Sequence, residues 1–118
     1  MFLHESTAEY QRALEFAKWC EPVLDRTPRQ SAMHTQLDVA RTTLLLKVAA
    51  GAGRGERDEP ALAAAGTAAL ESAACLDLLF NKRVVSREEL ERGKELLQRL
   101  VPLLDGGNAL AQSHAGAA

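Results

Sequence analysis

Apolar residues recur every three or four positions along four segments of the chain, a spacing that places them on one face of an α-helix. The segments are residues 6–24, 31–50, 59–80 and 87–105. Short polar, proline-containing or glycine-rich stretches separate them. Four amphipathic helices with short connections are typical of an antiparallel bundle. The pattern therefore predicts an all-α fold, with residues 1–107 forming one four-helix bundle and residues 108–118 a disordered C-terminal tail.

Helix starts are marked by capping residues. Ser86 and Glu89 have the spacing of a capping box, and Val85 and Leu90 have the spacing of the accompanying hydrophobic staple. Further helix starts are predicted by capping signals at the following positions: Ser6 with Glu9, Ser31, and Asp58 followed by Glu59 and Pro60.

Proline and glycine predict where helices end or bend. Pro22 should kink or end the first helix near Cys20, and Pro102 should bend the last turn of the fourth. The second helix should stop at Gly51 or Gly53, because glycine adopts the positive φ that commonly closes a helix. In the third helix, a strict heptad-like spacing predicts the buried seam to be Leu62, Gly66, Ala69, Ala73, Leu76 and Phe80.

Composition agrees with a helical, globular protein. Apolar residues make up 47% of the 118 positions, aromatic residues only 4%, and isoleucine is absent. Alanine and leucine, which dominate, favour helices over strands. The net charge of −2 gives no overall attraction to nucleic acid or anionic lipid. With no signal-peptide pattern and no evident membrane span, the sequence predicts a cytoplasmic protein.

The sequence contains no pattern that predicts catalysis, a cofactor or a metal site. Cys20 and Cys75 lack CxxC or zinc-ligand spacing, so we interpret them as reduced core thiols, with a disulfide as the alternative. His34 and Asp38 lie four residues apart and offer two possible metal ligands, but two ligands do not make a site. A solvated polar pair is the simpler interpretation.

The glycine-rich stretch from Gly51 to Gly55 superficially resembles a phosphate-binding loop. It lacks the preceding strand and the lysine that such loops require, so we interpret it as a turn between helices. Arg54 and Arg57 within or beside it have acidic neighbours, which favours ion pairs that stabilise the turn over an anion site.

Two segments carry more apolar residues than one buried stripe requires. The second helix contains Leu44, Leu45 and Leu46 in succession, and the fourth contains three apolar doublets at residues 96–97, 100–101 and 103–104. Exposed apolar surface of this kind promotes association. We therefore predict a homo-oligomer, with a broadened core face as the alternative.

The stretch from Gln36 to Arg54, QLDVARTTLLLKVAAGAGR, resembles the 23S rRNA intervening sequence protein family, encoded within bacterial large-subunit ribosomal RNA genes. The resemblance covers the second and third helices, and its motif turn is Gly51, Gly53 and Arg54. The remaining matching positions are Gln36, Ala40, Val48, Ala49, Glu59, Gly66 and Thr67. Lys47 and Ala50 replace an asparagine and a glutamate of the family motif.

The resemblance implies an up-down-up-down, left-handed bundle that assembles as a homopentamer. It also implies a relation to the accessory bundle protein of diversity-generating retroelements, which associates with a reverse transcriptase and nucleic acid. That relative is basic, whereas this chain is slightly acidic. We therefore predict a non-enzymatic, self-assembling protein that binds a macromolecular partner, favouring protein. The alternative is an RNA- or reverse-transcriptase-associated accessory protein, with Arg41, Lys47, Arg54 and Arg57 as phosphate contacts.

Overall fold

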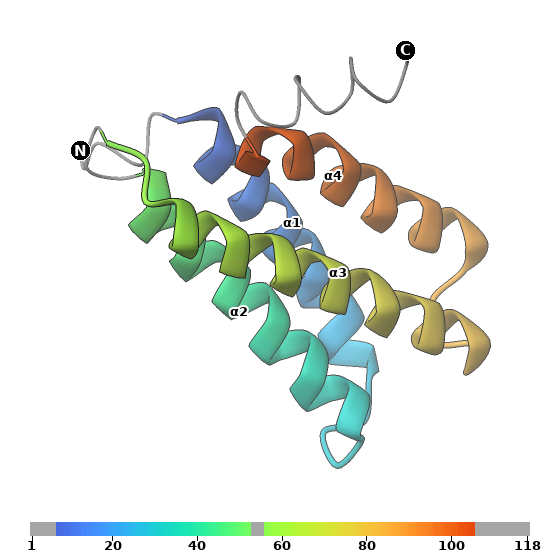
Figure 1. Ribbon diagram of the computed structural model, residues 1–118. Helices are drawn as coiled ribbons and strands as arrows, with labels where there is room; N and C mark the ends of the chain where they lie inside the picture. The colour runs from blue at the N-terminus through green and yellow to red at the C-terminus, as the bar shows by residue number, and fades with distance from the viewer. Residues whose placement is uncertain (1–6, 53–55, 106–118) are drawn as a thin grey trace.

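The computed structural model describes residues 7–52 and 56–105, and within them it confirms the predicted four-helix bundle. The helices are α1 (Ala8–Arg26), α2 (Ala32–Ala52), α3 (Glu59–Asn81) and α4 (Arg87–Asp105). Each packs against its neighbours in sequence, and α1 also packs against α4, so the four enclose one core (Figure 1). Ser6, Gly53, Arg54 and the predicted tail lie outside the described residues. The handedness implied by the resemblance stays a prediction.

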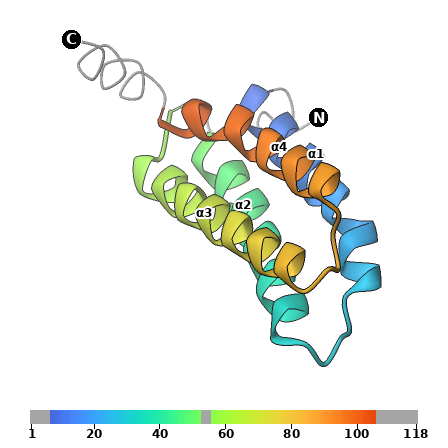
Figure 2. The same ribbon diagram turned by 90° about the vertical axis from the view of Figure 1, so that its right-hand side faces the viewer.

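The helices form two layers. The most extensive contact joins α2 and α3, which lie side by side, while α1 and α4 make up the other side of the bundle (Figure 2). Buried aliphatic side chains from all four helices meet between the layers, with Phe16 of α1 fully enclosed among them. This arrangement gives α2 and α3 a broad common outer face.

Several predicted helix starts are confirmed by their hydrogen bonds. The Ser86 N–H donates to Glu89 Oε1 at 2.9 Å, and the Glu89 N–H donates to Ser86 Oγ at 3.1 Å, which completes the capping box. Asp58 caps α3 through a bond from the Ala61 N–H, and Ser31 accepts a bond from the Met33 N–H at the start of α2.

At the first helix the predicted boundaries are wrong at both ends. Thr7 is the cap, with its hydroxyl accepting a bond from the Tyr10 N–H at 3.2 Å. The helix also continues through Pro22 to Arg26. Pro22 lies on the exposed side of α1, and the next turn is held to the core by buried Val23 and Leu24, so packing outweighs the lost backbone bond.

The prediction that α2 ends at Gly51 is also wrong. The helix includes Gly51 and runs to Ala52, and Gly51 does not have the positive φ of a helix-closing residue. A Cβ atom at this position would lie 2.6 Å from Cγ and Cδ2 of Leu62, which is buried in α3. The glycine is therefore required by close approach of α2 and α3, not by backbone conformation.

The buried face of α3 is rotated relative to the predicted seam. Leu62, Ala69 and Leu76 are buried as expected, whereas Gly66, Ala73 and Phe80 are only half-buried. The other buried positions of α3 are Ala65, Ala68, Ser72, Cys75 and Leu79. Since α2 provides the most extensive contact of α3, the helix buries this second row, made mostly of small residues, as well as part of the predicted one.

Among the described helices, α3 is long and apolar enough to cross a membrane, with a mean hydropathy of 1.4 over its most apolar stretch. Within that stretch, 44% of the residues are buried inside the bundle. The helix that fills the core of a bundle has the same composition, so this feature alone is weak evidence for a membrane span.

The end of α3 contains a strained residue. The Val84 N–H donates to Leu79 O and the Arg83 N–H to Phe80 O, the two bonds of a Schellman motif. Arg83 has a φ of 64°, in the position that glycine normally takes. We expect Arg83→Gly to raise the free energy of unfolding by about 0.5–1 kcal/mol, measured by urea denaturation, because glycine removes the Cβ clash.

Arg83→Ala is the matched control, because it removes the same side chain but keeps the Cβ atom. If Arg83→Ala stabilised the protein as much as Arg83→Gly, the gain would come from the lost side chain and the strain argument would be wrong.

Candidate functional site

The described residues contain no group of three or more histidine, cysteine or acidic side chains that is able to hold a metal ion. His34 and Asp38, the candidate pair, are not free for a ligand together, because Asp38 Oδ1 accepts bonds from Nε and Nη2 of Arg41 at 3.0 and 2.9 Å. Within the same part of the chain, every fully buried side-chain nitrogen and oxygen has a hydrogen-bond partner. The core therefore presents no polar group directed at a ligand.

The two cysteines are buried, unpaired thiols, as predicted. Burial raises the pKa of Cys20 to about 12, an effect that nearby Arg41 only partly offsets. Burial also raises the pKa of Cys75, with a smaller contribution from the charge of Glu71. Since the thiolate is the reactive form, neither side chain has the properties of a catalytic nucleophile at neutral pH.

Arg41 is the centre of a polar network between α1 and α2. Its side chain is only 16% exposed, and Nη1 donates to Glu21 Oε1 at 2.6 Å and to the Ala17 carbonyl at 3.0 Å. Burial lowers the pKa of Arg41, but the hydrogen bonds to Glu21 and Asp38 outweigh this effect and raise it. These hydrogen bonds all join Arg41 to acceptors of this chain. Arg41 therefore has a structural role, linking α2 to α1.

Arg57 has a similar role at the other end of the bundle. It donates to the carbonyls of Leu103 and Leu104 at 3.2 and 2.8 Å, where the last turn of α4 lacks intrahelical partners. It also pairs with Glu59 at 3.1 Å and with Glu9 at 3.6 Å. The predicted ion pair at this turn is confirmed for Arg57. Of the four proposed phosphate contacts, Arg54 lies outside the described residues, and only Lys47 is exposed without an ion pair.

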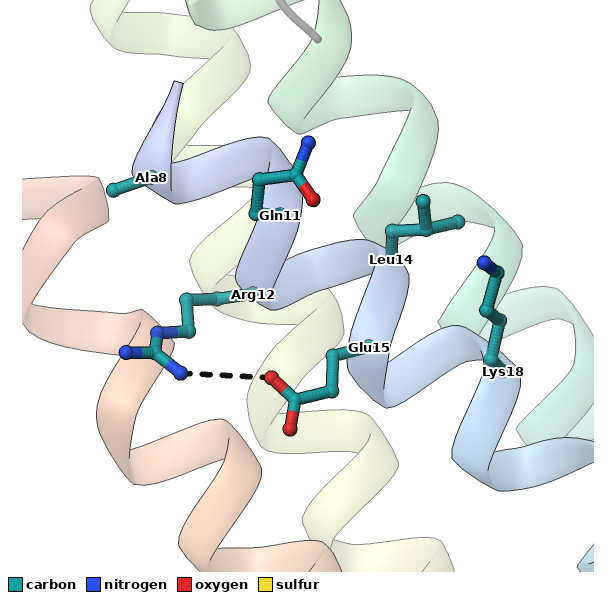
Figure 3. Close-up of a pocket in the computed structure, with 6 residues that line it drawn as sticks. All are labelled: Ala8, Gln11, Arg12, Leu14, Glu15 and Lys18. Atoms are coloured by element: carbon teal, nitrogen blue, oxygen red, sulfur yellow. Dashed lines mark ion pairs between the residues drawn. The ribbon is translucent and has the colours of Figure 1, made fainter. Parts of the chain in front are cut away.

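The surface hollows do not enclose a ligand. The one in Figure 3 is lined by residues of α1 alone, and its charged groups Arg12 and Glu15 form an ion pair at 3.5 Å. Small-molecule sites surround most of the ligand surface, which side chains from a single helix do not achieve. A more apolar hollow lies between α3 and α4 and is bordered by Leu70, Leu97, Val101 and Pro102.

The distinctive surface is the outer face of α2 and α3. Among the described residues, the large hydrophobic side chains that are exposed are Val39, Leu46, Leu70 and Leu78, at 57%, 63%, 71% and 46%. Two of them are on α2 and two on α3. Charged side chains have the opposite distribution, with seven on α1 and nine on α4 but three each on α2 and α3. We call the exposed parts of α2 and α3 the α2–α3 face.

This distribution confirms one part of the sequence argument and corrects the other. Leu44 is fully buried, Leu45 is half-buried and Leu46 is exposed, so the leucine run in α2 does exceed one buried stripe. The doublets in α4 do not add exposed surface, because Leu96, Leu97, Leu100 and Leu104 are buried and Val101 and Leu103 are half-buried. They fill the core because α4 packs against both α1 and α3.

Comparison with known proteins finds no family model, no curated protein and no solved structure that matches this chain. The resemblance of the Gln36–Arg54 stretch therefore stays a prediction from its residues.

Proposed function

We propose that this protein acts by association and not by catalysis: it self-assembles through the α2–α3 face and binds a macromolecular partner, favouring protein. The observation that carries the proposal is the concentration on these two helices of all four large hydrophobic side chains that are exposed within the described part of the chain. Single exposed hydrophobic residues are ordinary. A group of them confined to one layer of a small bundle is typical of an interaction surface.

The energetics support association of this face. Fully burying one large aliphatic side chain contributes about 1.5–3 kcal/mol, so covering even part of four such residues is a substantial gain. The scarcity of charge on α2 and α3 lowers the cost of desolvating the surface around them. The highly charged α1 and α4 then remain in contact with water and keep the assembly dispersed.

The number of subunits is suggested only by the family resemblance, which favours a pentamer. A cytoplasmic location likewise stays a prediction. A ring of identical interfaces is one closed arrangement that covers apolar surface on every copy.

Light scattering coupled to gel filtration tests self-assembly directly. We expect a mass above the 12.8 kDa of one chain, and about five times that value if the assembly is a pentamer. A stable monomer at tens of micromolar would contradict the proposal. A dimer or tetramer would support association while removing the number taken from the resemblance.

The alternative, an RNA- or reverse-transcriptase-associated protein, has less support, because Arg41 and Arg57 are held by this chain's own acceptors. Among the candidate cations that lie in the described residues, only Lys47 has no ion pair. A gel-shift assay distinguishes the two: micromolar binding of generic RNA that weakens steeply with salt would favour the alternative.

A further inference from the structure

The α2–α3 face carries two charges that have no partner within the described residues. Lys47 of α2 and Glu71 of α3 are both exposed, and neither makes an ion pair or a side-chain hydrogen bond there. The other charged residues within α2 are paired, since Arg41 binds both Asp38 and Glu21. Asp77 of α3 pairs with Lys94 of α4. One positive and one negative group are thus left on an otherwise apolar and weakly polar face.

Both groups lie about two turns from an exposed hydrophobic residue of the same helix. Lys47 follows Val39 on α2, and Glu71 precedes Leu78 on α3. A partner that covers Val39 and Leu78 along these two helices also removes water from the two charges. A charge left without a partner in an interface is costly, so the covering surface has to supply an anion near Lys47 and a cation near Glu71.

We propose that a second copy of this chain supplies both, with α2 of one copy packed against α3 of another and Lys47 paired with Glu71 across the contact. This inference rests on the proposed self-assembly and names the charges that orient it. An acidic partner would satisfy Lys47 but repel Glu71, and a basic partner would do the reverse. The α2–α3 face is complementary in charge to itself.

Residue spacing on the two helices agrees with this contact. Val39 precedes Lys47 by eight residues, and Leu78 follows Glu71 by seven, which correspond to about 12 and 10.5 Å along a helix. When the two contacting helices run in opposite directions, pairing Lys47 with Glu71 brings Val39 and Leu78 to nearly the same height. One register thus places the ion pair and an apolar contact together.

Charge reversal tests the pairing. Lys47→Glu and Glu71→Lys should each raise the dissociation constant of the assembly at least tenfold, measured by light scattering over a dilution series. The double variant should have a dissociation constant within about threefold of the wild-type value. Arg29→Glu in the connection between α1 and α2 and Glu91→Lys on α4 are matched controls at exposed positions without ion pairs among the described residues, and they should leave assembly unchanged. Circular dichroism of each variant verifies that the helices are retained.

The outcomes distinguish failure of the Lys47–Glu71 contact from failure of the proposed self-assembly. If wild-type protein assembles but the single reversals behave like the controls, or the double variant fails to recover, the Lys47–Glu71 contact is wrong and self-assembly stands. If wild-type protein is a monomer under all conditions, the proposed function fails and this inference fails with it.

Discussion

Leu46→Lys is expected to convert the assembled protein to a 12.8 kDa monomer at concentrations where the wild-type protein is oligomeric. The Leu46 side chain is 63% exposed in the single chain, so lysine at this position meets water and leaves the core intact. Lysine also has nearly the helix propensity of leucine. In the assembly, however, the substitution places an unpaired charge in an apolar contact, which is strongly unfavourable.

The matched control is Ala8→Lys, which adds the same charge at an exposed position of α1. It should leave the mass of the assembly unchanged. Leu44→Lys provides the opposite comparison, because Leu44 is fully buried and the charge would unfold the monomer itself. An assembled Leu46→Lys variant with wild-type mass would show that the α2–α3 face is not the association surface.

Gly51→Val is expected to lower the free energy of unfolding by about 3 kcal/mol, at the upper end of typical overpacking costs. The new side chain would meet Cγ and Cδ2 of Leu62 at 2.6 Å and the Leu62 backbone nitrogen at 3.3 Å. Leu62 is 1% exposed and has little room to move. Valine at this position forces α2 and α3 apart at the largest helix contact in the bundle. Urea denaturation monitored by circular dichroism measures the loss.

Gly66→Ala is the matched control within the same helix pair. A Cβ atom built at Gly66 meets nothing within 4 Å, so alanine should stabilise the protein by up to about 1 kcal/mol through its higher helix propensity. The opposite signs expected at Gly51 and Gly66 separate steric crowding from propensity. An unchanged urea midpoint for Gly51→Val would show that α2 and α3 are not closely packed there.

Gly51 also shows why the role of a glycine is difficult to predict from sequence. A glycine near the end of an apolar repeat predicts a helix stop, because glycine commonly takes a positive φ there. At Gly51 the residue instead lies within the helix, close to Leu62. Both situations select glycine, so residue type alone does not distinguish them. Gly93 of α4 has the same explanation, since a Cβ atom would lie 2.6 Å from the Trp19 ring.

The sequence by itself determined the four helices and most of their ends. Caps depend on residues only two or three positions apart, so Ser86 with Glu89 and Asp58 with Ala61 are readable without knowing the fold. Helical periodicity likewise identified the stripe of α2 that includes Leu37 and Leu44. These features are local, and the tertiary structure did not override them.

Only the tertiary structure decided which apolar and charged side chains the bundle uses internally. Periodicity gives the direction of each side chain around its own helix, but not how many neighbouring helices cover that direction. The extra leucines of α4 are therefore covered, whereas Leu46, Leu70 and Leu78 remain exposed. For the same reason Arg41 and Arg57 find acceptors on segments distant in the chain, and Lys47 and Glu71 find none among the described residues.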